Sequence, residues 1–196
     1  AQVRSRGTIG GSVSAADPNC DWPALLNTLD AEIRCSGPEG DRTIAIGDFI
    51  TEAYTTALQP GELVTSVRFR TPPAGSGGAY IAYKKAAAAF PVISVGVQMT
   101  VAPGNVCQDV RIALGGSGPT PRRAEQAEAE LCGKALNSQV WQHAADAVAA
   151  IAEPTDDVRG SSEFKRQLLR GLFLKAGDTA TRRSANAIIE GSHVYA

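Results

Sequence analysis

Residues 107–124 read CQDVRIALGGSGPTPRRA, and along this stretch the sequence changes from the pattern of a strand to that of a helix. Residues 107–114 are predicted to form the strand, and residues 115–118, Gly-Gly-Ser-Gly, form the turn after it. Thr120 and Pro121 then supply a capping hydroxyl and a proline suited to the first position of a helix. A glycine-rich turn in this setting needs no ligand, so we do not interpret it as a phosphate loop.

The sequence before this stretch predicts two more strands, over residues 79–84 and 92–101. The segment 102–105, Ala-Pro-Gly-Asn, is predicted to form the turn between the second strand and the third. Neighbouring strands with a short connection favour an antiparallel meander. The stretch at 107–124 therefore ends a predicted three-stranded antiparallel sheet.

Apolar residues recur at helical spacing in three segments after these strands. The first segment follows the cap at Thr120, and the second spans residues 140–151 after a cap at Asn137 or Ser138. The third segment, over residues 162–175, carries a wide apolar stripe. Three strands followed by three helices predict an α+β sandwich.

Residues 71–78, TPPAGSGG, are the clearest break in composition, because proline and glycine are poorly held in helices and ladders. We place a domain boundary there, with one domain over residues 1–72, a second over 78–180 and a tail over 181–196. A tail lying on a partner chain and a disordered tail both remain possible. The first domain is predicted to contain a short helix at 21–29, a hairpin of strands at 31–35 and 43–46, and a strand at 63–69.

The composition predicts a globular chain, since 196 residues with 43% apolar and 20% charged residues can bury a full core. A net charge of −1 provides no basic stripe, so nucleic acid is not an expected partner. No apolar run approaches the roughly 20 residues of a membrane span, and the signal-peptide pattern is absent. We therefore expect a soluble, cytoplasmic protein. Its first residue is Ala rather than Met, which indicates a fragment or a processed piece of a larger polypeptide.

The cysteine and histidine content argues against a metal site and against hydrolase chemistry. Four cysteines are scattered singly, without a C-x-x-C pair, and the chain has two histidines, so zinc and iron–sulfur clusters lack a ligand set. His143 falls within a predicted helix and His193 within the tail, and neither has a recognisable nucleophile beside it. We expect no catalytic side chain and no metal ligand in this chain.

The candidate ligand site is the run Thr8, Ile9, Gly10, Gly11 and Ser12. Paired glycines between small residues let the backbone turn tightly and bring several N–H groups against an anionic or planar ligand. Surface turns use glycine pairs too, so the pattern alone leaves a plain turn as an alternative.

Asp21 follows in the run Asp-Trp-Pro-Ala-Leu-Leu and also has two interpretations. Its position before Trp and Pro is typical of the cap of a short helix. Its carboxylate is equally suited to hydrogen-bond a sugar hydroxyl of a ligand.

Taken together, longer strings in the sequence resemble the FAD-binding medium subunit of the molybdenum hydroxylases. This family includes carbon monoxide dehydrogenase, xanthine dehydrogenase and aldehyde oxidoreductase types. The strings are residues 8–23, with Thr-Ile-Gly-Gly-Ser and Ala-Asp-Pro-Asn-Cys-Asp-Trp-Pro, residues 61–67, residues 80–95 and residues 109–124. The resemblance covers nearly the whole chain, to about residue 180. It implies that the chain is the C-terminal two-thirds of such a subunit, with the second lobe of a two-lobed FAD-binding domain followed by the α+β domain.

The resemblance also implies a set of FAD-binding residues. Residues 8–12 would surround the FAD phosphates and ribityl chain, and Asp21 would hydrogen-bond the polyol. Val64 matches a position whose backbone contacts the flavin, with a core strand residue as the alternative. Lys84 matches a lysine near the flavin, unless it is a solvated charge at a strand end. Phe90 matches an apolar residue of a loop that covers the isoalloxazine, with simple core packing as the alternative.

The implied function is that of an oxidoreductase subunit, which passes electrons from [2Fe-2S] clusters through FAD to an external acceptor. Its implied partners are a molybdopterin-binding large subunit, a [2Fe-2S] small subunit, and an N-terminal FAD-lobe segment. That segment would complete the pyrophosphate cradle, so this chain alone is expected to hold half of the FAD site. Two alternatives remain: an α+β module that binds partner subunits without flavin, and a stand-alone flavin oxidoreductase.

Overall fold

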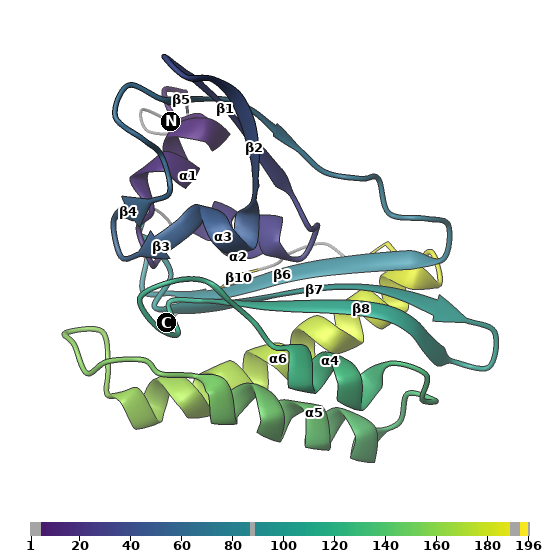
Figure 1. Ribbon diagram of the computed structural model, residues 1–196. Helices are drawn as coiled ribbons and strands as arrows, with labels where there is room; N and C mark the ends of the chain where they lie inside the picture. Colours follow the sequence, from purple (N-terminus) through teal and green to yellow (C-terminus); the bar gives the residue numbers. More distant parts are fainter. Residues whose placement is uncertain (1–4, 87–88, 189–192, 196) are drawn as a thin grey trace.

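The computed structural model describes residues 5–86, 89–188 and 193–195. We call residues 5–70 the N-terminal lobe and the described residues from 76 onward the C-terminal lobe. The C-terminal lobe is a sheet with long helices against one face, and the N-terminal lobe lies over the opposite face (Figure 1). This arrangement confirms the predicted α+β class.

The helices are α1 (Ile9–Ala15), α2 (Asp21–Asn27), α3 (Ile46–Phe49), α4 (Glu125–Leu131), α5 (Ser138–Ile151) and α6 (Ser162–Ser184). The strands of the N-terminal lobe are β1 (Glu32–Gly37), β2 (Gly40–Ala45), β3 (Ile50–Glu52), β4 (Thr55–Thr56) and β5 (Leu63–Arg68). Those of the C-terminal lobe are β6 (Ser76–Lys84), β7 (Ile93–Ala102), β8 (Val106–Gly115), β9 (Arg122–Arg123) and β10 (His193–Tyr195).

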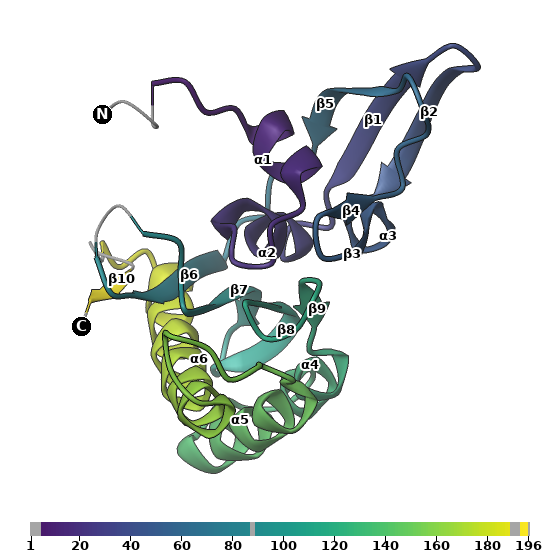
Figure 2. The same cartoon turned by 90° about the vertical axis from the view of Figure 1, so that its left-hand side faces the viewer.

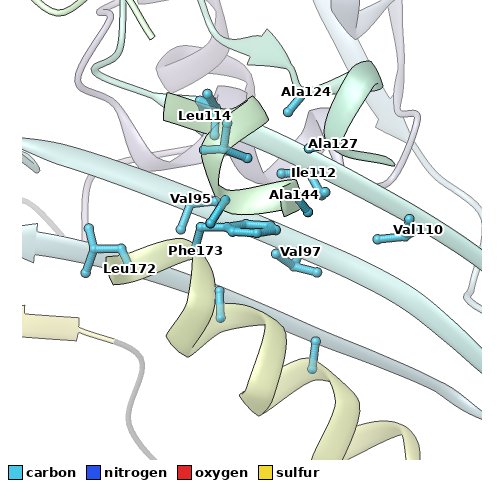
Figure 3. Close-up of a cluster of buried hydrophobic side chains, with 14 of the residues drawn as sticks. Val95, Val97, Val110, Ile112, Leu114, Ala124, Ala127, Ala144, Leu172 and Phe173 are labelled. Atoms are coloured by element: carbon cyan, nitrogen blue, oxygen red, sulfur yellow. The ribbon is translucent and has the colours of Figure 1, made fainter. Parts of the chain in front are cut away.

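The sheet of the C-terminal lobe has the strand order β10-β6-β7-β8-β9. The predicted meander is confirmed, because β6, β7 and β8 pair antiparallel in sequence order, with Val97 opposite both Ala79 and Ile112. One face of these strands is apolar and buried beneath α4, α5 and α6. Figure 3 shows Phe173 of α6 among Val97 and Ile112 in this core.

Helix α6 is longer than predicted and ends at Ser184 rather than near residue 175. The added turns bury the small residues Ala176, Gly177 and Ala180. Ala180 lies close to β6, and Gly177 leaves room for the Trp141 ring of α5. A Cβ at Gly77 of β6 would collide with the backbone carbonyl of Ala180. Close packing of small residues therefore holds the last turns of α6 in place. These turns lack the large apolar side chains by which a helix is recognised in a sequence.

The predicted start of the first helix at Thr120 and Pro121 is wrong. Arg122 and Arg123 instead form β9 beside β8, and α4 begins at Glu125. Pairing with an open sheet edge and a salt bridge from Arg123 Nε to Glu128 Oε1 (2.7 Å) hold this segment extended. The second helix has Asn137 as its cap, because the Asn137 side chain accepts the Val140 amide proton.

The segment predicted as a tail contributes to the fold. Helix α6 extends into it, and the backbone of β10 pairs parallel to β6, with Val194 opposite Tyr83. The parallel pairing of β10 covers an edge of β6 that would otherwise present unpaired backbone groups.

The N-terminal lobe has its own sheet, with the strand order β2-β1-β5, and its own apolar core. The predicted hairpin is present, since β1 and β2 pair antiparallel around a turn that joins Gly37 to Gly40. Ile33 of β1 and Phe49 of α3 lie in this core and are fully buried. The two lobes therefore have separate hydrophobic clusters.

Helix α2 connects the lobes by packing on the outer face of β7 and β8, opposite α5 and α6 (Figure 2). Glycines on the strands permit this approach, because a Cβ at Gly96 would lie 2.7 Å from Thr28 Cγ2. Arg123 of β9 adds a bond from Nη1 to Asp30 Oδ1 at 2.6 Å. None of the helices described is long and apolar enough to cross a bilayer.

Candidate cofactor-binding site

The glycine pair at residues 10 and 11 lies in the first turn of α1 rather than in an irregular turn. Thr8 is the N-cap residue: its Oγ1 accepts the Gly11 amide proton at 3.0 Å, and its carbonyl accepts that of Ser12 at 3.0 Å. Hydroxyl side chains are favoured at this position because they satisfy an amide that has no intrahelical partner. The role of N-cap therefore accounts for a threonine at position 8 without any ligand.

Two backbone N–H groups at the start of α1, those of Ile9 and Gly10, make no hydrogen bond within the part of the chain that the structure describes. They lie at the positive end of the helix dipole, on an exposed surface. The position of a Cβ at Gly10 is 3.6 Å from Val64 Cγ1 on β5. Free amides, nearby hydroxyls and an open backbone suit an anionic group such as a pyrophosphate.

Asp21 is not the cap of α2, because the N-cap residue is Cys20 and makes no side-chain capping bond. The Asp21 carboxylate instead accepts two hydrogen bonds from β6, in the other lobe. Tyr80 Oη donates to Oδ1 at 2.9 Å, and Lys84 Nζ donates to Oδ2 at 2.9 Å. The Lys84 side chain is only 9% exposed. The alternative interpretation of Lys84, as a solvated charge at a strand end, is therefore wrong.

Burial is the main reason that the pKa of Tyr80 is raised well above its usual range, and the charge on Asp21 raises it further. The nearby hydroxyl of Ser94, a buried residue of β7, lowers the pKa of Tyr80 to a smaller extent. The phenol is therefore protonated at physiological pH and donates to Asp21.

Phe90 lies on the loop between β6 and β7 and is 50% exposed. The alternative interpretation, that Phe90 packs in the core, is therefore wrong. The ends of this loop are tied to residues 155–160. Lys85 Nζ donates to the Val158 carbonyl at 3.1 Å, and Arg159 Nη1 donates to the Pro91 carbonyl at 3.2 Å. These bonds hold the ends of the loop while Phe90 remains free to contact a ligand.

The predicted site residues thus fall into pairs that the fold brings together: Gly10 with Val64, and Asp21 with Lys84. The sequence interpretation missed Tyr80, which bonds Asp21. Tyr80 precedes Lys84 by four residues on a strand, a spacing that places both on one face. That spacing was the available signal for Tyr80.

Two grooves lie between the lobes. One, of about 560 Å³, is lined by residues of α2, β6 and β7 that include Asp21, Trp22, Tyr80 and Gln98. A larger one, of about 700 Å³, is lined by residues 68–73, at the end of β5 and the start of the linker between the lobes. Neither groove is lined by residues 8–12. The first turn of α1 and these two grooves are therefore separate surfaces of the described chain.

Among residues 5–86, 89–188 and 193–195, no group of three or more His, Cys, Asp or Glu side chains is placed to hold a metal ion. Cys20, Cys35 and Cys107 are buried free thiols, and Cys132 is exposed. Burial raises the pKa of Cys107 to about 12. Such a thiol is a poor nucleophile and a poor metal ligand at neutral pH.

Comparison with known families gives two matches, which together cover most of the chain. Residues 78–180 match the CO dehydrogenase flavoprotein C-terminal domain. Residues 1–72 match the FAD binding domain in molybdopterin dehydrogenase.

Curated relatives include the carbon monoxide dehydrogenase medium chain of Afipia carboxidovorans, 36% identical over 185 residues. That alignment covers 94% of this chain and 64% of the relative. The glyceraldehyde dehydrogenase medium chain of Sulfolobus acidocaldarius is 35% identical over 178 residues, which cover 89% of this chain and 62% of the relative.

Among solved structures, carbon monoxide dehydrogenase from Hydrogenophaga pseudoflava superposes with a TM-score of 0.90 at 37% identity. The match covers 93% of this chain and 63% of that chain. Quinoline 2-oxidoreductase from Pseudomonas putida gives a TM-score of 0.87 at 26% identity, over 94% of this chain and 64% of that chain. The chain thus spans less than two-thirds of the length of these relatives.

Proposed function

This chain belongs to the FAD-binding medium-subunit family of the molybdenum hydroxylases, and on that premise we propose that it binds FAD in an oxidoreductase complex. It would accept electrons from [2Fe-2S] clusters on a partner chain and pass them to an external acceptor. The observation that carries this proposal is the match of residues 1–72 to the FAD binding domain in molybdopterin dehydrogenase, a range that contains the unbonded amides of Ile9 and Gly10 in α1. When bound, FAD supplies the electron-transfer chemistry, because flavin accepts electrons singly and releases them singly or in pairs.

The residues of α1 would hold the phosphates and the ribityl chain. Thr8 and Ser12 contribute hydroxyl groups, and Ile9 and Gly10 contribute amides at the positive end of the helix. Gly11 keeps the surface free of a side chain beside the Thr8 hydroxyl. Val64 supports this turn from β5, where its side chain packs beside Gly10.

Lys84 and Asp21 form the second half of the proposed site. Lys84 Nζ can donate three hydrogen bonds, and within the described residues its recorded partner is Asp21. Leaving ammonium protons unpaired in a nearly buried position is costly, so an acceptor on a ligand would stabilise it. Each Asp21 oxygen accepts one bond from β6 and keeps a lone pair for a polyol hydroxyl. Phe90, exposed on its loop, would cover the flavin ring.

We propose the same division of the chain that the sequence predicts. Residues 1–72 form the C-terminal lobe of the FAD-binding domain, residues 78–180 form the flavoprotein C-terminal domain, and residues 181–196 form a terminal segment. Two observations support it: each lobe has its own apolar cluster, and residues 71–73 of the linker line the groove between them.

The proposed partners are a molybdopterin-binding large subunit, a [2Fe-2S] small subunit and an N-terminal FAD-lobe segment. The support is that several relatives are named as medium chains or subunits, such as the medium subunit of nicotine 6-hydroxylase. The α1 amides and the groove beside Asp21 lie on open surfaces that a further segment can complete. We propose a cytoplasmic location for the complex.

The test is to purify the full-length protein from its own organism with the chains that remain attached to it. We expect stoichiometric FAD, molybdenum and iron in the complex, and loss of flavin absorption when the complex is reduced. A flavin-free complex would contradict the proposal and would support a module that only binds partner subunits. Flavin without molybdenum or iron would instead support a stand-alone flavin oxidoreductase.

A further inference from the structure

A line of three hydrogen-bonded side chains joins the two lobes. Tyr80 donates to Asp21 Oδ1 at 2.9 Å, and Lys84 donates to Asp21 Oδ2 at 2.9 Å. Tyr80 and Lys84 lie on β6, and Asp21 begins α2 of the other lobe.

The direction of each bond is determined by chemistry. The Asp21 carboxylate only accepts and the Lys84 ammonium only donates. Because burial keeps Tyr80 protonated, its hydroxyl proton is available for Asp21. Both bonds to Asp21 therefore run from β6 to the carboxylate.

The hydrogen bond from Tyr80 restricts the orientation of the Asp21 carboxylate, which the ion pair with Lys84 alone would leave free to rotate. Lysine has a long, flexible side chain, and a single bond to a carboxylate that can itself rotate does not fix its ammonium. The phenol of Tyr80 is a rigid group on the same strand, and its bond to Oδ1 directs Oδ2 toward Lys84. Lys84 is thus positioned through Asp21.

We propose that Tyr80 is a positioning residue that holds the Asp21 carboxylate against Lys84 and so fixes the Lys84 ammonium between the two lobes. The proposal rests on the proposed function in one respect, namely that the ligand which Lys84 faces is FAD. The positioning of Lys84 itself is a property of the chain and can be measured without flavin.

The first test measures how fast an amine-specific acetylating reagent modifies each lysine of the full-length protein, by peptide mass spectrometry. We expect Y80F to speed acetylation of Lys84 by about tenfold, since a lost hydrogen bond to a charged group changes an equilibrium by about that factor. The exposed Lys85 and the buried Lys165, which is paired with Asp157 at 2.8 Å, are internal controls. Their rates should change by less than about twofold.

The matched control variant is Y83F, on the same strand. The ring of Tyr83 packs edge-on against Phe164, with centroids 6.1 Å apart, and takes no part in the line of hydrogen bonds. Y83F should leave the Lys84 rate unchanged. An unchanged Lys84 rate in Y80F would overturn the proposal. An equal acceleration at Lys165 would also overturn it, because Tyr80 would then support the fold in general.

The second test is a double-mutant cycle on FAD affinity with Y80F, K84M and the double variant. We expect Y80F alone to raise the Kd for FAD by about tenfold, and by less than about twofold when K84M is already present. Equal effects in both backgrounds would refute positioning through Lys84. If the wild-type protein binds no FAD, the proposed function fails, and the acetylation rates still decide the role of Tyr80.

Discussion

Replacing Gly11 by alanine should separate cofactor binding from folding, because the two depend on different atoms at this position. An added Cβ would lie 3.0 Å from the Thr8 hydroxyl oxygen, and the structure shows no other heavy atom within 4 Å of it outside the helix backbone and the adjoining residues. In a helix the Cα–Cβ bond tilts toward the N-terminus. The new methyl group would therefore lean toward the unbonded amides of Ile9 and Gly10.

The expected change in folding free energy is small. Exchange of glycine for alanine within a helix is worth about 1 kcal/mol, and displacing the Thr8 hydroxyl costs about 1 kcal/mol of capping. These terms nearly cancel, so stability should stay within about 1 kcal/mol of wild type. A hydrogen bond to a charged group contributes about 1.5–3 kcal/mol, so obstructing one amide should weaken FAD binding by about 10- to 100-fold.

The assay combines an equilibrium titration of FAD, followed by flavin fluorescence, with urea unfolding of the same variant. Gly171→Ala is the matched control, because Gly171 is exposed within α6 and a Cβ there meets nothing within 4 Å. That variant should gain up to about 1 kcal/mol of stability with unchanged FAD affinity. Our reasoning is refuted if Gly11→Ala binds FAD within about twofold of wild type, or if its affinity and stability fall together.

Three further predictions follow from the packing and the charges. Gly77→Ala should destabilise the protein by about 2 kcal/mol or more in urea unfolding, because its methyl group would collide with the carbonyl of Ala180; an unchanged midpoint would show that α6 moves freely. Arg42 lowers the pKa of Glu62 to about 2, below its usual 4.5, so this pair stabilises the fold above pH 4.5 and loses that effect as pH falls toward 2. Arg42→Gln should therefore reduce stability at neutral pH and flatten the acid limb of the unfolding curve, and an unaltered limb would contradict the assignment. Ser117 Oγ is buried without a partner in the described residues, so Ser117→Ala should be neutral or stabilising by up to about 2 kcal/mol, whereas a clear loss in Tm would indicate a bound water.

The central strands were predictable from sequence because their side chains alternate between two buried faces and their turns contain proline and glycine. The start of α4 was not. Thr120 and Pro121 carry local signals for a helix, but the two arginines after them pair with the edge of β8, which is distant in sequence. Tertiary pairing outweighed a local preference there.

The end of α6 was missed for a different reason. Ala176, Gly177 and Ala180 are buried, but as small residues they leave no strong apolar periodicity. Only the sheet packed against them explains why the helix continues.

The sequence predicted which residues form the candidate site, but it did not predict which of them contact one another. Residues 8–12 were recognised from their sequence pattern, but their helical conformation was not predicted. The Thr8 hydroxyl caps the helix by accepting the Gly11 amide proton, whereas a glycine pair is more typical of a turn. Asp21 and Lys84 are 63 residues apart in sequence, and their ion pair depends on how α2 packs on the sheet. Tyr80 entered the site through that packing as well.

The most direct test of the central claim is amide hydrogen exchange of the full-length protein with and without FAD. The Ile9 and Gly10 amides make no hydrogen bond in the described structure and should exchange rapidly in the absence of ligand. We predict that saturating FAD slows exchange at these amides by more than about tenfold, with little change in α5, which lies on the far side of the sheet. Unchanged exchange at Ile9 and Gly10, together with protection elsewhere in a protein that demonstrably binds FAD, would contradict our account of where the cofactor binds.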